Sequence, residues 1–304
     1  MSTSATRPTR LLPAATLREL SRTSDAKGLA RLSIHLLLLA AGASLIYAAQ
    51  GTWWLLPAML LYGWFLVALF AVVHETVHYT AFNSRRLNEI VAWFAAAPSL
   101  LNADFYRQFH FAHHRHLQDP ARDPELNPLP PDGIGRYLVR IFGLQYWGIR
   151  LRVAWAIARG RLDRFWFIAE AQKRSVIRSV RLMLLFDAAL LFVPLAFGSL
   201  APLLYWIGPM ILAQPILRLI LVTEHTGCTM DDNPLTNTRT TLASWPLRLV
   251  HWNMPFHAEH HLYPSIPFHA LPQAHRLIGD RFRHVSPSYL QGNREIIAGF
   301  GSPT

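Results

Sequence analysis

The first long apolar stretch runs from Leu32 to Val73 without any Lys, Arg, Asp or Glu, and Gln50-Gly51-Thr52 interrupts it near its middle. As a helix this stretch would extend about 63 Å at 1.5 Å per residue. That length suits two crossings of a hydrocarbon layer about 30 Å thick. Trp53 and Trp54 follow the interruption and are the side chains expected where a membrane meets water.

A second apolar stretch runs from Leu182 to Thr223 and is interrupted at Gly198-Ser199 and Pro202. Its only charged residues are Asp187 and Arg218. A charge inside a span is costly in lipid, so the simplest expectation is that these two side chains pair. Together the two stretches predict an all-α membrane protein with two transmembrane helical hairpins. The four spans are expected near residues 32–49, 53–73, 182–198 and 202–222.

Composition agrees with a membrane protein, because 52% of the 304 residues are hydrophobic and only 15% are charged. The net charge of +11 would also suit a nucleic-acid binder. However, all 29 Lys and Arg residues except Arg218 lie before residue 32, between 74 and 181, or after 224. Two hairpins place these three segments on one side, which the positive-inside rule makes cytoplasmic. Topology and attraction to membrane lipids therefore account for the charge, and no nucleic-acid partner is expected.

Three clusters of histidine lie just beyond the expected spans, all on this cytoplasmic side. We call HETVH (74–78), HFAHH (110–114) and HAEHH (257–261) the first, second and third histidine box. Helical residues at i, i+3 and i+4 share a face, so each box can converge on a metal ion. The eight candidate ligands are His74, His78, His110, His113, His114, His257, His260 and His261. Eight imidazoles can hold two metal ions at about four nitrogens each, whereas a catalytic zinc needs three protein ligands.

Two other functions fit part of this pattern. HETVH alone has the H-E-x-x-H form of a zinc protease with Glu75 as general base, which leaves the other two boxes unexplained. A non-enzymatic metal carrier would usually place its ligands inside the spans rather than beyond their ends. Imidazole binds iron, copper, zinc and nickel, so the ligand type does not name the metal.

The order of the three boxes and spans resembles the integral-membrane fatty acid desaturase and hydroxylase superfamily. The resemblance covers roughly residues 30 to 285 and includes HETVHYTAF at 74–82, HHRHLQDPARDPEL at 113–126 and NMPFHAEHHLYPSIP at 253–267. It implies two non-haem iron ions and dioxygen as co-substrate, acting on an unactivated C–H bond. A metal cofactor must carry such chemistry, since no side chain can.

The resemblance also implies a ninth ligand. His225, just past the fourth expected span, matches a ligand of members that act on acyl-CoA. Those members carry Asn one helical turn earlier, where this chain has Leu221.

Other polar residues are candidates for supporting the ligands. Glu75, Glu224 and Glu259 are expected to accept the outer N–H of ligating histidines, with a solvated carboxylate near Arg as the alternative. Asn253 could hold a metal-bound water or cap the helix of the third box. We expect loop salt bridges for a group of three acidic residues, Asp119, Asp123 and Glu125.

The expected function is a fatty acid or lipid desaturase, with a lipid hydroxylase, ketolase or oxidative decarboxylase of the same superfamily as alternatives. No catalytic residue is expected beyond the metal centre. The chain has a single Cys and no flavin or nicotinamide fingerprint, so electrons must come from an external ferredoxin, rubredoxin or cytochrome with its reductase. Such a donor would dock on the Arg-rich cytoplasmic face.

The chain is expected to divide into a basic N-terminal cytoplasmic segment (1–31), a membrane desaturase-like domain (32–285) and a C-terminal tail (286–304). The histidine boxes would lie in a cytoplasmic helical cap. The first apolar stretch begins too late for a cleavable signal, so none is expected to be removed. We expect a multi-pass integral protein of a bacterial inner membrane, with both termini cytoplasmic.

Overall fold

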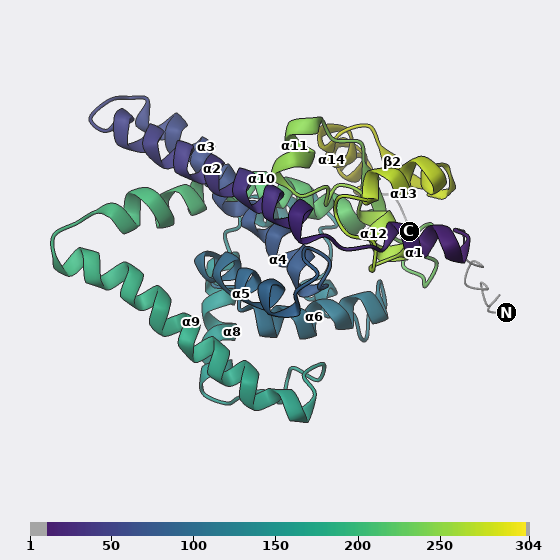
Figure 1. The fold of residues 1–304 in the computed structure, drawn as a ribbon, viewed down its shortest axis with the longest axis horizontal. Helices are drawn as coiled ribbons and strands as arrows, with labels where there is room; N and C mark the ends of the chain where they lie inside the picture. The colour runs from purple at the N-terminus through teal and green to yellow at the C-terminus, as the bar shows by residue number, and fades with distance from the viewer. Residues whose placement is uncertain (1–10, 302–304) are drawn as a thin grey trace.

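The computed structural model describes residues 11–301, which form a mostly helical protein with one small sheet (Figure 1). The first eight helices are α1 Ala14–Leu20, α2 Asp25–Ala49, α3 Leu55–Val67, α4 Leu69–Val77, α5 Arg85–Ala96, α6 Ala103–His116, α7 Ile134–Ile141 and α8 Tyr146–Ala158. The later ones are α9 Glu170–Ala196, α10 Gly208–His225, α11 Trp245–Val250, α12 His257–Leu262, α13 Leu271–Ile278 and α14 Tyr289–Ala298. Short 3₁₀ helices are η1 Ala97–Ser99, η2 Pro124–Leu126 and η4 Gly279–Arg281, and η3 Leu203–Ile207 is π-helical. Strands β1 Arg239–Thr241 and β2 His284–Ser286 pair in parallel.

In the described part of the chain, three helices are long and apolar enough to cross a membrane: Asp25–Ala49, Leu55–Val77 and Leu203–His225. They cover the spans expected near 32–49, 53–73 and 202–222. Each continues beyond its expected cytoplasmic end, because a helix needs only its own backbone hydrogen bonds to extend into polar sequence. The second span therefore includes His74 and ends directly before His78, and the third ends at His225.

The span expected near 182–198 forms the second half of the longer helix α9, which is not among these three. The first half of α9 carries a series of basic residues: Lys173, Arg174, Arg178 and Arg181. Its second half leaves Leu185, Phe192 and Val193 exposed, as a lipid-facing surface would. The expected pairing of Asp187 with Arg218 is wrong. Among residues 11–301 the Asp187 carboxylate oxygens have no hydrogen-bond partner, whereas the Arg218 guanidinium lies 4.1 Å from the ring centroid of Tyr146.

Glycines allow the membrane helices to approach closely. Gly42 of α2 lies against the side chain of Tyr62 in α3, and Gly63 of α3 lies against the carbonyl oxygen of Pro209 in α10. Gly51 lies in the α2–α3 connection with a φ of 74°, a conformation that glycine adopts without steric cost. Helix α10 thus packs along α3, and both lead directly towards the histidine boxes.

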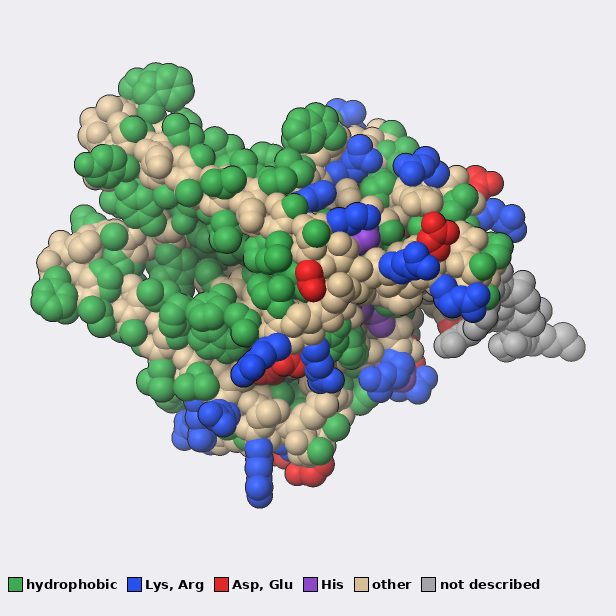
Figure 2. Space-filling view, viewed as in Figure 1, with side chains coloured by type: hydrophobic (Ala, Val, Ile, Leu, Met, Phe, Trp, Pro, Cys, Tyr) green, Lys and Arg blue, Asp and Glu red, His purple; other side chains and the backbone are tan. Residues whose placement is uncertain are grey.

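Hydrophobic and charged side chains occupy opposite ends of the molecule. Hydrophobic side chains cover the end formed by the α2–α3 hairpin and the α9–α10 connection (Figure 2). Lys and Arg side chains lie instead over the part that contains α1 and α11 to α14, and over the lower part of the view around α8 and the first half of α9. This separation fits a protein with one end in lipid and the other in water.

Candidate metal centre

The histidine boxes lie on three helices that come from distant parts of the chain. The first box is at the end of α4, where His78 follows the last helical residue. The second box occupies the last two turns of α6, which begins with the Asn102 side chain accepting the Phe105 N–H. The third box forms most of the short helix α12, and His225 is the last residue of α10.

One set of five histidines converges from all three boxes. His74, His78, His110, His114 and His260 each offer a ring nitrogen, and these nitrogens lie within 4.8 Å of one another. The Nε2 atom of His114 is 3.1 Å from Nε2 of His110 and 3.2 Å from Nε2 of His260. Two nitrogens bound to one tetrahedral ion at about 2.1 Å would be separated by about 3.4 Å. We call these five residues the first histidine set.

A second set contains the remaining box histidines and His225. His113, His225 and His261 offer ring nitrogens within 4.8 Å of one another. The Nε2 atom of His257 lies 3.0 Å from Nε2 of His225 and 3.0 Å from Nε2 of His261. We call these four residues the second histidine set. All nine candidate ligands therefore fall into two neighbouring sets of five and four.

Burial and unmet hydrogen bonding suit this centre to a metal. The Nε2 atoms of His74 and His78 are buried and have no hydrogen-bond partner among the described residues. A buried polar nitrogen without a partner costs about 1–3 kcal/mol. A metal ion would satisfy these nitrogens, and the imidazole-rich donor set suits a transition metal.

Burial also keeps most of the imidazoles neutral. It lowers the pKa well below the ordinary histidine value, and neighbouring imidazoles lower it further, at His110, His114, His257, His260 and His261. Metal binding requires the neutral form of the ring, so these histidines are ready to bind without losing a proton.

His113 differs because acidic residues surround it. Burial lowers its pKa, but Glu125 and the hydrogen bond to Asp123 outweigh burial, so that the pKa is raised. Burial raises the pKa of Glu125, but the electrostatic interaction with nearby histidines, His113 foremost, outweighs burial and lowers the pKa below its ordinary value.

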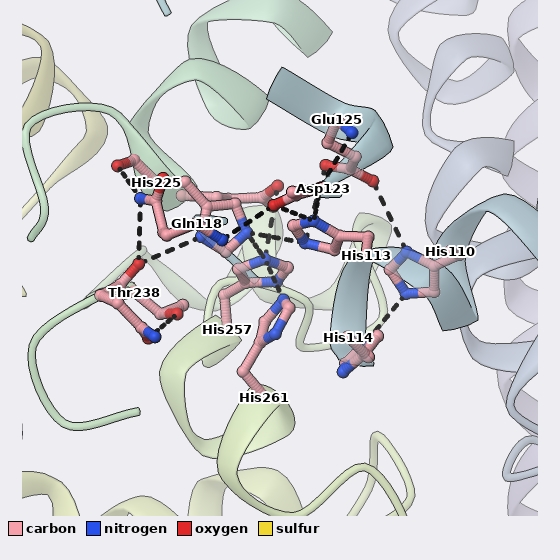
Figure 3. Close-up of polar contacts among 12 residues, drawn as sticks. His110, His113, His114, Gln118, Asp123, Glu125, His225, Thr238, His257 and His261 are labelled. Carbon is pink, nitrogen blue, oxygen red and sulfur yellow. Dashed lines mark hydrogen bonds and ion pairs between the residues drawn. The ribbon is translucent and has the colours of Figure 1, made fainter. Parts of the chain in front are cut away.

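The Asp123 carboxylate orients the second box (Figure 3). His113 Nδ1–H donates to Asp123 Oδ1 over 2.9 Å, and the backbone N–H groups of Gln118 and Glu125 donate to the same carboxylate. The Gln118 side-chain amide donates to the carbonyl oxygen of His225 over 3.0 Å. This network joins the loop after α6 to the end of α10. We expected loop salt bridges for Asp119, Asp123 and Glu125. Asp119 does pair with Arg122, whereas Asp123 and Glu125 contact histidines of the second box instead. Their position in DPEL, shortly after the second box, was the available signal.

Two of the four proposed supporting residues bind other partners. Glu75 Oε1 accepts the backbone N–H of Phe268 over 2.9 Å. Glu259 Oε1 accepts Nδ1–H of His275 over 2.5 Å, so it orients a histidine outside both sets. In each case the carboxylate accepts from a donor on another segment rather than from a ligating ring.

Of the other two, Glu224 lies near a box histidine, whereas Asn253 does not cap the helix of the third box as expected. Glu224 Oε2 is 3.7 Å from His257 Nε2, which is too far for a hydrogen bond. The Asn253 side chain donates to the carbonyl oxygen of Phe268 over 2.8 Å and makes no cap on α12, whose N-cap residue is Phe256.

Histidines outside the two sets have separate structural roles. His116 lies against the ring of Trp166, as its position off the ligand face predicts. His251 is buried and its Nε2 accepts the indole N–H of Trp64 over 3.0 Å. His35, also buried, contacts the carbonyl oxygen of Phe65.

Comparison with known proteins agrees with this geometry. Residues 51–293, most of the chain, match the family described as Fatty acid desaturase. The chain is 28% identical over 249 residues to the dihydrorhizobitoxine desaturase of Bradyrhizobium elkanii, a match that covers 74% of this chain and 68% of that protein. It is 26% identical over 229 residues to the sphingolipid delta(4)-desaturase of Candida albicans, covering 70% of this chain and 59% of that protein. With its boxes assembled from α4, α6 and α12, this chain belongs to the fatty acid desaturase family.

Proposed function

We propose that this protein is a membrane-bound, dioxygen-dependent desaturase that holds two iron ions and acts on a fatty acyl chain or another lipid. The observation that carries the proposal is the division of nine histidines into two adjacent sets, of five and four rings. The first set would hold one ion and the second set the other. The bound ions would supply the oxidising power that breaks an unactivated C–H bond.

The side chains of the protein position and protect this centre. Asp123 holds the Nδ1 proton of His113, which leaves Nε2 free to face the second set. Gln118 fixes the end of α10 and with it His225. Most of the ligating rings are buried, so bulk water is excluded from the reacting centre.

An acyl chain can reach this centre from the bilayer, because two of the apolar spans lead directly to histidine ligands. The name of one relative includes a sphingolipid, which supports a lipid substrate. Electrons would come from an external ferredoxin, rubredoxin or cytochrome. The termini and the boxes would be cytoplasmic, in a multi-pass protein of a bacterial inner membrane.

The environment of Glu75 weighs against a zinc protease. A protease would need this carboxylate free to activate water, whereas it is buried and accepts the Phe268 N–H. His74 and His78 also face three further imidazoles of the first set, more than a catalytic zinc site requires.

Iron content and product mass test the proposal. The purified protein is expected to contain close to two iron atoms per chain, and a single stoichiometric zinc would refute it. Lipids from cells that express the protein should include a product lighter than its precursor by two hydrogens. A product heavier by one oxygen would instead indicate hydroxylation. His260→Ala should abolish the product, whereas His116→Ala, a histidine of the second box helix outside both sets, should retain it.

A further inference from the structure

The two histidine sets differ in the acidic groups around them. Within residues 11–301, Glu125 and Glu224 place carboxylate oxygens within 4 Å of Nε2 atoms of the second set. Glu125 Oε2 lies 3.7 Å from His113 Nε2, and Glu224 Oε2 lies 3.7 Å from His257 Nε2. These are the same Nε2 atoms that face the other rings of the set. Both carboxylates therefore point towards the place where the second ion would sit.

Glu125 also reaches the first set. Its other oxygen, Oε1, lies 3.6 Å from Nδ1 of His110, whose Nε2 faces His114 (Figure 3). The Glu125 carboxylate thus lies near the inward-facing Nε2 of His113 in the second set and near the outward-facing Nδ1 of His110 in the first set.

The backbone holds Glu125 in this position. Glu125 lies in η2, and its N–H donates over 2.9 Å to Asp123 Oδ1, the same oxygen that accepts the Nδ1 proton of His113. A single aspartate therefore fixes the relative positions of the glutamate and the histidine.

Glu224 is fixed by the last turn of α10, directly before His225. The side chain is 11% exposed, and its Oε1 atom is buried without a hydrogen-bond partner among the described residues. A buried carboxylate without a donor carries a large desolvation cost unless a positive charge compensates it. In the described part of the chain no Lys or Arg side chain makes an ion pair with Glu125 or Glu224.

A metal ion accounts for these distances. A separation of 3.7 Å is too long for a hydrogen bond. Two atoms that each lie about 2.1 Å from one ion are separated by about 3 to 4 Å. The nitrogen–oxygen distances on both glutamates fall in this range.

We propose that Glu125 and Glu224 are metal ligands of the second set, which then offers four imidazoles and two carboxylates. The inference rests on the proposed two-metal function and deepens it. Oxygen donors favour ions such as iron(II) and manganese(II), whereas a purely imidazole site such as the first set also suits zinc and copper. The two sites would therefore differ in charge and in metal preference.

Metal stoichiometry tests the inference without any measurement of activity. The double variant E125Q/E224Q keeps the size of both side chains but weakens them as ligands. Apo protein in detergent would be loaded anaerobically with iron(II) and, separately, with cobalt(II), then passed through size exclusion. The wild type should retain two ions per chain. The double variant keeps the four imidazoles of the second set, so it should bind the second ion more weakly and lose it during size exclusion. Each single variant should weaken binding of the second ion by about 10- to 100-fold.

The matched control is E89Q/E170Q, which changes two exposed glutamates that pair with Arg85 and Lys173. It should retain two ions. If the double variant is monodisperse, retains two ions and has an unchanged cobalt absorption spectrum, the two glutamates are not ligands. That result would leave the proposed function standing. Fewer than two ions in the wild type would overturn the proposed function itself. If the double variant does not fold, the single variants decide, and wild-type affinity in both would count against the two ligands.

Discussion

His251 shows how a buried residue outside the metal centre makes stability depend on pH. Burial lowers its pKa to about 3, and its Nε2 must stay unprotonated to accept the Trp64 N–H. In the unfolded chain the pKa is about 6.5. Between these values the unfolded chain binds the additional proton, so the stabilisation is complete above about pH 6.5 and is lost as pH falls towards 3.

Replacing His251 with Gln should therefore flatten the pH dependence of folding. We expect the free energy of unfolding of the wild type to fall by up to about 1.4 kcal/mol more per pH unit than that of the variant below pH 6.5. Apparent melting temperatures of the metal-free protein in detergent, at pH 7.5 and pH 5, measure this difference. Equal slopes for the two proteins would contradict the assignment.

At the level of single residues, spacing predicted the groups that share a helix face but not their partners across the chain. The i, i+3, i+4 pattern was sufficient to place His110, His113 and His114 on one face. The contact of Glu75 with Phe268 joins residues 193 positions apart, which no local pattern encodes. Asp123 was misassigned for a related reason, because a loop folds back on α6 only in three dimensions.

At the level of helices, hydrophobicity located the membrane-spanning parts better than the helix ends. Apolar runs reflect contact with lipid, whereas helices end where backbone hydrogen bonding stops, as at Gln50 or at the turn after His225. The sequence therefore placed the first box beyond a span, although α3 and α4 carry the span into the box. In α9 a charged first half and an apolar second half belong to one continuous helix, so the apolar run alone did not reveal where this helix begins.

Close packing of α3 against α10 predicts a strong effect of a single methyl group. A Cβ atom at Gly63 would lie 2.3 Å from the carbonyl oxygen of Pro209, a backbone atom that cannot rotate away. We expect Gly63→Ala to destabilise the protein by about 1–3 kcal/mol. A lower melting temperature in detergent would measure this loss.

Gly148→Ala is the matched control, since Gly148 lies exposed in α8 and a Cβ there would meet no atom closer than 4.0 Å. That change should be neutral or stabilise the helix by about 0.5–1 kcal/mol. An equal decrease of the melting temperature in the two variants would show that the α3–α10 contact does not cause the destabilisation.

For the whole molecule, the separation of apolar and basic surfaces predicts its orientation. Gln50 lies at the exposed α2–α3 connection, and Asp132 lies at an exposed site in the loop after the second box. Cys228 can be replaced by Ser to provide a background without thiols. On this background Gln50→Cys should react with a membrane-impermeant maleimide in intact cells. Asp132→Cys should react only after permeabilisation, and labelling of both from one side would contradict the topology.

The overall arrangement could be predicted from the sequence to the extent that it follows from hydrophobic runs and histidine spacing. The division of nine histidines into sets of five and four could not. It depends on how α12 inserts between α6 and α10, since His257 and His261 join the second set while His260 joins the first. Neighbouring residues of one box thus belong to different sets.

The continuity of α3 and α4 limits how this protein can adapt to bilayers of different thickness. Gly63 is held against α10, and His74, about three turns further on, is held by the first set. One residue inserted between them would rotate the box by about 100° and move its rings off the shared face. Hydrophobic mismatch can therefore be accommodated within this helix only between Leu55 and Gly63, a segment of about two turns next to Trp53 and Trp54.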